Sequence, residues 1–130
     1  MGARRPRPVV LDAGALIAFE RNDRKVRTLV ELALTHGGEL HVPGGVVAQV
    51  WRDGSRQARL ARLIGSGLVR VQPLDCEEAQ ATGALCGHTG ARDVVDASVA
   101  LLARRHGAAV VTSDPEDLRR IDSKIEIVAC

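Results

Sequence analysis

Short apolar segments alternate with stretches of helical spacing along the chain, and this alternation is the strongest constraint on its fold. Segments typical of buried strands lie at 9–11, 40–42, 68–71, 109–112 and 125–128. Between them, as in 25–34 and 94–105, apolar residues recur at the three- and four-residue intervals of helices. Strands that alternate with helices predict a parallel sheet with helices on both faces. We therefore expect an α/β protein with a central, mostly parallel five-stranded sheet.

The length of the chain, 130 residues, is that of one domain. The opening residues 1–8 are basic and rich in proline, which predicts a flexible basic tail, and residues 9–130 then form the domain. Hydrophobic residues make up 45% of the chain and charged residues 26%, as is typical of a soluble globular protein. With only one Phe, one Trp and no Tyr, the core must be aliphatic, and stacking on bases is not the expected way of binding single strands.

Charge and cysteine content narrow the class of protein further. A net charge of +2 is too small to indicate a strongly basic nucleic-acid scaffold. The three cysteines are odd in number and form no CxxC pair, so neither a disulfide framework nor a zinc knuckle is indicated. This cysteine use favours a reducing, cytoplasmic location. The apolar runs are far shorter than the ~20 residues needed to span a bilayer, so no membrane association is expected.

Aspartates follow the apolar segments at points that a parallel sheet brings together. Asp12 directly follows 9–11, and Asp114 comes shortly after 109–112. Asp93 and Asp96 lie one turn apart at the start of the helix predicted over 94–105. Because the carboxyl ends of parallel strands face a common crevice, we expect these acids to meet there. For Asp93 and Asp114 the alternative is a helix cap without further function.

Gathered carboxylates repel one another, so such a cluster usually needs a cation. Carboxylate oxygens suit Mg²⁺ or Mn²⁺ and leave positions for water around the ion. A bound ion of this kind lowers the pKa of water and polarises a phosphoryl oxygen. The aspartates therefore predict a metal site for phosphodiester hydrolysis.

In their order and spacing, the segments VVLDAGALIA, RDVVDASVALLA and VVTSDPEDL resemble the PIN-domain ribonucleases, and within them the VapC-type toxins of toxin–antitoxin pairs. The resemblance covers nearly the whole chain. It implies a three-layer α/β/α sandwich and a Mg²⁺- or Mn²⁺-dependent endoribonuclease that cleaves RNA. It also implies a homodimer inhibited by a VapB-like antitoxin.

The resemblance also implies roles for single residues. Asp12, Asp96 and Asp114 correspond to catalytic, metal-binding acids of the family, Asp93 supplements them, and Thr112 is a supporting hydroxyl. Where the family usually has a Glu after the second strand, this chain has Gln49, which carries no charge. The Ser or Thr that often follows the first acid is replaced by Ala13-Gly14. A PIN-fold protein with weakened catalysis, which acts by binding RNA or a protein partner, is therefore the alternative function.

A run of arginines between the second and third strands is a further candidate site. Arg52, Arg56 and Arg59 would form a basic stripe on one helix face if the helical segments around them were continuous. Such a stripe is a possible RNA-contacting surface, and the alternative is a solvated helix face. Neither the G-x-S-x-G turn of serine hydrolases nor the G-x-G-x-x-G turn of dinucleotide-binding proteins is present.

Overall fold

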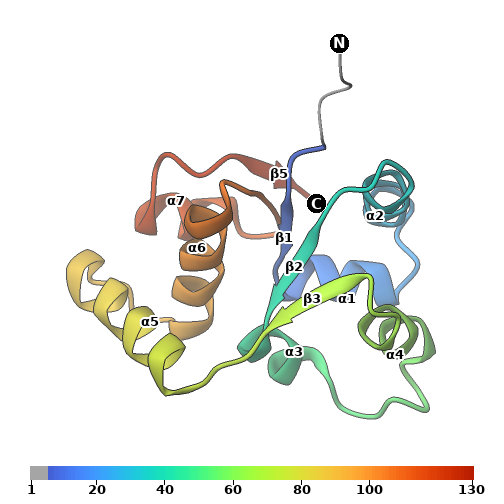
Figure 1. Cartoon of the computed structure of the whole chain (residues 1–130), viewed down its shortest axis with the longest axis horizontal. Helices are drawn as coiled ribbons and strands as arrows, with labels where there is room; N and C mark the ends of the chain where they lie inside the picture. The colour runs from blue at the N-terminus through green and yellow to red at the C-terminus, as the bar shows by residue number, and fades with distance from the viewer. Residues whose placement is uncertain (1–5) are drawn as a thin grey trace.

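A computed structural model describes residues 6–130, which form one sheet and the helices that cover it (Figure 1). The strands are β1 (Val9–Leu11), β2 (Leu40–Pro43), β3 (Val69–Gln72), β4 (Ala109–Thr112) and β5 (Ile127–Ala129). They lie in the order β3-β2-β1-β4-β5, and every neighbouring pair is parallel. The predicted α/β class and five-stranded sheet are therefore confirmed, and the sheet is parallel throughout.

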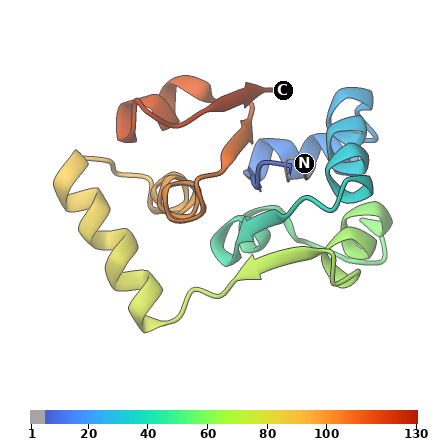
Figure 2. The same ribbon diagram turned by 45° about the horizontal axis from the view of Figure 1, so that its top comes forward.

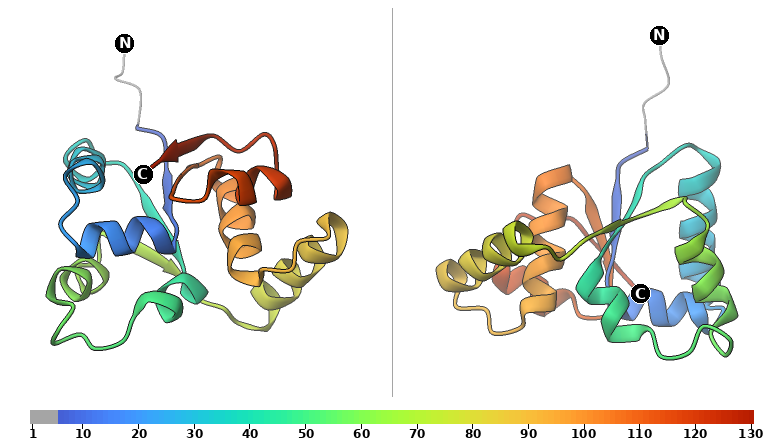
Figure 3. Two further views of the ribbon diagram at one scale, coloured as in Figure 1. Left: turned by 180° about the vertical axis from the view of Figure 1, so that it is seen from behind. Right: turned by 60° about the horizontal axis from the view of Figure 1, so that its bottom comes forward.

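Two groups of helices enclose the sheet and give the three layers predicted from the alternation of strands and helices. Within residues 6–130 the helices are α1 (Ala13–Glu20), α2 (Arg24–Thr35), α3 (Gly44–Val50), α4 (Ala58–Gly65), α5 (Cys76–Thr89), α6 (Val94–His106) and α7 (Pro115–Ile121). Helices α1, α2 and α4 lie together on one side, whereas α5, α6 and α7 lie on the other (Figures 2 and 3). Helix α5 packs on α6 and forms the outer part of its layer.

The core is aliphatic, as the near absence of aromatic residues predicts. Val10, Val42 and Val110 on the three central strands are fully buried. Leu16 of α1 and Leu102 of α6 are buried as well, and both belong to the same cluster of core residues. Strands that are buried on both faces need apolar residues at successive positions, which explains why the strands were readable as short apolar runs.

The order of the strands creates one position where the direction of the chain across the sheet reverses. From β1 the chain proceeds outward to β2 and β3, and then returns to the other side of β1 with β4 and β5. Strands β1 and β4 are paired with Leu11 opposite Val111, so their carboxyl ends lie side by side. Ligands of open parallel sheets bind at such a reversal point.

The predicted basic tail is described only in part. Residues 1–5 lie outside the described residues, whereas Arg7 forms an ion pair with Glu126 and donates a hydrogen bond to the carbonyl of Gly107 at 3.1 Å. None of the helices within residues 6–130 has the length and apolar character needed to cross a bilayer.

Candidate functional site

A small polar pocket lies at the reversal point of the sheet, where the aspartates were expected to meet. We call it the acidic pocket. It has a volume of about 140 Å³ and is lined by Asp12, Ala13, Gly14, Gln49, Asp93, Val95, Asp96, Val99, Ser113, Asp114 and Asp117. The structure therefore brings together all four aspartates selected from the sequence, together with Gln49 and a fifth carboxylate.

Asp12 connects β1 to α1 and is the most deeply buried acid of the pocket, with 7% of its surface exposed. Its carboxylate caps α1 by accepting a hydrogen bond from the backbone N–H of Ala15 at 2.9 Å. Burial raises the pKa of Asp12, and hydrogen bonds from the Thr112 hydroxyl and the Ala15 N–H oppose that rise. These donors hold the Asp12 carboxylate in one orientation. They also favour its ionised form, which burial alone would disfavour.

Thr112, at the end of β4, interacts with both Asp12 and Asp114. Its side chain is fully buried, and its hydroxyl hydrogen bonds with the carboxylate of Asp12. The same oxygen accepts a hydrogen bond from the backbone N–H of Asp114 at 2.9 Å. The Thr112 hydroxyl therefore interacts with both the Asp12 carboxylate and the backbone that carries Asp114.

Asp93 and Asp96 differ in what their carboxylates contact. Asp93 is the N-cap of α6, where its Oδ1 accepts hydrogen bonds from the N–H groups of Val95 at 2.9 Å and Asp96 at 3.1 Å. Helix capping, the alternative considered for Asp93, is therefore one of its functions. Asp96 is half-buried, and its pKa is raised to about 6. Burial is the largest cause, followed by the negative charges of Asp93, Asp117, Asp12 and Asp114.

Asp114 and Asp117 reach the pocket from the start of α7. Asp114 occupies the N-cap position of this helix, but its side chain makes no capping hydrogen bond, so the capping alternative does not explain its carboxylate. Asp117 was not among the predicted site residues. The signal for it was present in the sequence, because a spacing of three residues places Asp117 on the same side of a helix as Asp114.

Gln49 and Gly14 mark the two positions where the pocket departs from the expected pattern. Gln49, on α3, lines the pocket and contributes a neutral amide in place of a carboxylate. Any Cβ at position 14 would overlap the side chain of Ser113, so only glycine fits there. The hydroxyl of Ser113 therefore lies against the backbone of Gly14, which with Ala13 takes the place of the Ser or Thr that often follows the first acid in the family.

The chemistry of the donor set fits a hard divalent cation, because its charged ligands are all carboxylates. Within residues 6–130, no three His, Cys, Asp or Glu side chains already stand close enough together to hold a metal ion. The carboxylates thus line the pocket in an open arrangement, and ion binding requires their side chains to move inward.

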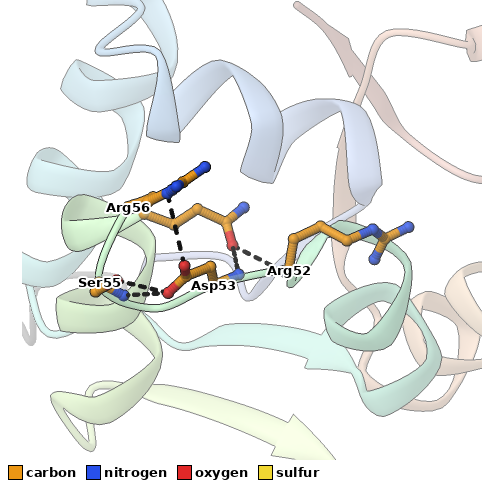
Figure 4. A network of polar contacts seen from close by, with 5 residues as sticks. Arg52, Asp53, Ser55 and Arg56 are labelled. Atoms are coloured by element: carbon orange, nitrogen blue, oxygen red, sulfur yellow. Dashed lines mark hydrogen bonds and ion pairs between the residues drawn. The ribbon is translucent and has the colours of Figure 1, made fainter.

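The arginines between β2 and β3 do not line the acidic pocket, and they do not share one helix. Helix α3 ends at Val50 and α4 begins at Ala58, so the continuous stripe considered from the sequence is not formed. Arg52 donates hydrogen bonds to the carbonyls of Ala48 at 3.2 Å and Trp51 at 2.6 Å. Arg56 pairs with Asp53 at 3.7 Å, and Ser55 donates to the same carboxylate (Figure 4). Contact of these arginines with RNA stays a prediction.

The PIN domain matches residues 9–124, which is most of the chain. This chain belongs to the PIN domain family. The family membership inferred from the three aspartate-containing segments is thereby confirmed. No curated protein matches this sequence.

Solved structures with the same fold include several toxin–antitoxin proteins. A chain of VapBC2 from Rickettsia felis, bound to a DNA fragment from its promoter, has a TM-score of 0.70 at 14% identity, over 94% of this chain and 98% of that chain. A chain of DNA-bound VapBC from Salmonella typhimurium has a TM-score of 0.67 at 18% identity, over 95% and 98%. VapC20 of Mycobacterium tuberculosis, described as a sarcin–ricin loop cleaving toxin, has a TM-score of 0.56 at 20% identity, over 78% and 86%. At these identities, the likeness establishes a shared fold.

Proposed function

We propose that this PIN-domain protein is a Mg²⁺- or Mn²⁺-dependent endoribonuclease and the toxin of a VapBC-type toxin–antitoxin pair. The observation that carries the proposal is the acidic pocket, in which five carboxylates from separate segments meet at the reversal point of the sheet. The negative charges of the neighbouring aspartates, together with burial, raise the pKa of Asp96 to about 6, and a shared cation would relieve this repulsion. Membership in the PIN domain family and the shared fold with VapC20, a toxin that cleaves the sarcin–ricin loop, support RNA as the substrate.

In this proposal Asp12, Asp96 and Asp114 bind the cation. Asp93 contributes negative charge while it caps α6, and Thr112 holds Asp12 and Asp114 in position. When bound, the divalent cation lowers the pKa of water and polarises a phosphoryl oxygen, which favours in-line attack on a phosphodiester. The carboxylate of Asp96 is available as a ligand of the cation, because within residues 6–130 its side chain lines the pocket and forms neither a helix cap nor an ion pair.

The proposal includes the partners that the family resemblance implies. Chains described as VapBC complexes share the fold, which supports a VapB-like antitoxin as the partner of this chain. We also propose that the protein is a homodimer and acts in the cytoplasm, where its RNA substrate is found. A small antitoxin that covers the acidic pocket would block access of RNA, and its removal would release the activity.

The test is cleavage of total RNA by the purified protein, measured with Mg²⁺, with Mn²⁺ and with EDTA. We expect cleavage with either cation and none in EDTA. The rate of cleavage should fall at least about 100-fold in the Asp96→Asn variant, since removal of a charged group that acts in the transition state has effects of this size. Glu31→Gln, on the exposed surface of α2, is the matched control with one carboxylate removed elsewhere. Equal cleavage by the parent protein and by Asp96→Asn would exclude this site.

Toxin activity is tested separately, by growth after induced expression. We expect growth arrest with the parent chain, no arrest with Asp96→Asn, and relief of the arrest when the cognate antitoxin is expressed together with the toxin. Growth arrest by both chains would mean that toxicity does not depend on the acidic pocket.

A second function has one specific observation in its favour. Gln49 lines the pocket without adding charge, so the site has less negative charge on the α3 side than the family pattern provides. A protein with such a site would bind RNA or a protein partner and cleave poorly. The Gln49→Glu variant distinguishes the two functions. A large gain in Mg²⁺-dependent cleavage identifies the native site as weakened. An unchanged rate, with a parent protein that is already active, favours the efficient nuclease.

A further inference from the structure

A second, larger cavity adjoins the acidic pocket. It has a volume of about 370 Å³, within the range of about 300–1,000 Å³ in which small-molecule sites fall. Three aspartates, Asp93, Asp96 and Asp117, line both cavities. The other residues that line it come from the α5–α6 connection and from α7, and they are Thr89, Gly90, Ala91, Arg92, Arg120 and Ile121. We call this the adjoining cavity.

Two arginines join the three aspartates that line the adjoining cavity, whereas the charged residues that line the acidic pocket are all aspartates. Arg92 lies in the exposed connection between α5 and α6 and precedes the cap of α6. Arg120 lies on α7, where its guanidinium is paired with Asp117 at 3.2 Å and its side chain is 78% exposed. An exposed pair of this kind contributes little to stability, so Arg120 can exchange this partner for another anion.

The position of these arginines matches a requirement of the proposed substrate. RNA carries a phosphate at every nucleotide, and an acidic pocket repels each phosphate that no cation neutralises. A divalent cation in the acidic pocket would contact the phosphate that is cleaved and would leave the negative charge of the next phosphate without a partner. The neighbouring phosphate needs a positive group of its own, and arginine is well suited because its planar guanidinium binds phosphate through two parallel hydrogen bonds.

We propose that the adjoining cavity is a nucleotide subsite, in which Arg92 and Arg120 bind the phosphate next to the cleaved bond of single-stranded RNA. This inference rests on the proposed function, since it takes the substrate of the acidic pocket to be RNA. The two arginines approach from different segments, the α5–α6 connection and α7, and so enclose the cavity from two sides. The subsite would fix the direction in which the strand passes the carboxylates.

The test is the affinity of the protein for a fluorescein-labelled single-stranded RNA of mixed sequence, followed by anisotropy at several salt concentrations. The buffer contains Ca²⁺, which takes oxygen ligands as Mg²⁺ does, and the integrity of the RNA is checked on a gel. The variants are Arg92→Gln, Arg120→Gln and the double variant. Arg119→Gln is the matched control, because it removes the same charge from α7 at a residue that pairs with Glu116 and does not line the cavity.

For single strands, each phosphate contact adds ~0.7 to the salt dependence of the logarithm of the binding constant. The double variant is therefore expected to lower the salt slope by about 1.4 and to bind roughly 25-fold more weakly at about 0.1 M salt, with each single variant losing about fivefold. Arg119→Gln is expected to bind like the parent protein. Both arginines are exposed, so the midpoint of thermal unfolding should stay the same in every variant.

The same affinity and slope in the double variant and in Arg119→Gln would overturn the subsite, as would the absence of RNA binding by the parent protein. Failure of the proposed nuclease function has a different signature. In that case the parent protein cleaves no RNA with Mg²⁺, whereas the arginine variants still lower its affinity for RNA, and the subsite stands as an RNA-binding site.

Discussion

The carboxylate of Asp96 is expected to destabilise the cation-free protein at neutral pH, so that the Asp96→Asn variant is more stable than the parent protein. Burial and the surrounding aspartates raise the pKa of Asp96 from 3.8 to about 6. That rise corresponds to at most ~3 kcal/mol of unfavourable free energy in the ionised state. Because the side chain is only half-buried, solvent screening reduces the expected cost to about 2 kcal/mol.

Two other contributions limit the expected gain. The ionised Asp96 lies in the first turn of α6, where its interaction with the helix dipole is worth about 0.3–1 kcal/mol that asparagine loses. The substitution removes no side-chain hydrogen bond within residues 6–130. The bond between Asp96 and Asp93 is donated by the backbone N–H of Asp96, which the variant keeps. The net gain in the free energy of unfolding is therefore about 1–2 kcal/mol, equivalent to roughly 4–8 °C in Tm for a chain of this size.

The gain must depend on pH in a defined direction. Since the pKa of Asp96 is higher in the folded protein than in the unfolded chain, the folded protein holds more protons between pH 3.8 and about 6. Stability therefore falls as the pH rises through this window, and the cost is complete only above about pH 6. The raised pKa of Asp12 acts in the same direction.

Urea unfolding in EDTA, at pH 7 and near pH 4, measures this effect. The Asp96→Asn variant should exceed the parent protein by about 1–2 kcal/mol at pH 7 and match it near pH 4. Glu31→Gln, whose carboxylate is exposed on α2, should stay within about 0.5 kcal/mol of the parent protein at both pH values. The reasoning is refuted if Asp96→Asn is less stable at pH 7, or if its gain is the same at both pH values.

Two further predictions concern packing, one at the acidic pocket and one between α5 and α6. Gly14→Ser should destabilise the protein by about 1–3 kcal/mol, because a Cβ at position 14 overlaps Ser113, and Ser113→Gly should restore at least half of that loss in a double-mutant cycle. Arg105→Leu should lower the free energy of urea unfolding by about 1–3 kcal/mol, because it removes the partner that lies 2.8 Å from the buried Glu78 carboxylate. Adding Glu78→Gln should recover part of this loss. Additive losses in the two variants would contradict the pairing.

The features that the sequence predicted are those with a local signal. The central strands β1 and β4 are runs of apolar residues because they are buried on both faces, and the polar residue that follows each run lies at the carboxyl edge of the sheet. Asp12 and Asp114 were found in this way, and the parallel sheet then required them to be neighbours. Asp75 is the N-cap of α5, where its carboxylate accepts a hydrogen bond from the N–H of Glu78 at 2.8 Å.

The features that the sequence did not predict depend on how separate segments meet. Arg92 and Arg120 are distant in sequence, and only the packing of α6 and α7 places them around one cavity. The arginine stripe was not formed because residues 51–57 are a loop. Within that loop the side chain of Gln57 accepts hydrogen bonds from the N–H groups of Arg52 at 2.8 Å and Asp53 at 3.0 Å, which replaces helical bonding.

The central claim is that the carboxylates of the acidic pocket share one divalent cation, and titration of the metal-free protein with Mn²⁺ in a calorimeter tests it most directly. We expect saturable binding of at least one ion per chain in the parent protein, and loss of that binding in Asp96→Asn, which keeps the shape of the site and removes one charge. No binding by the parent protein, or equal binding by both proteins, would contradict it.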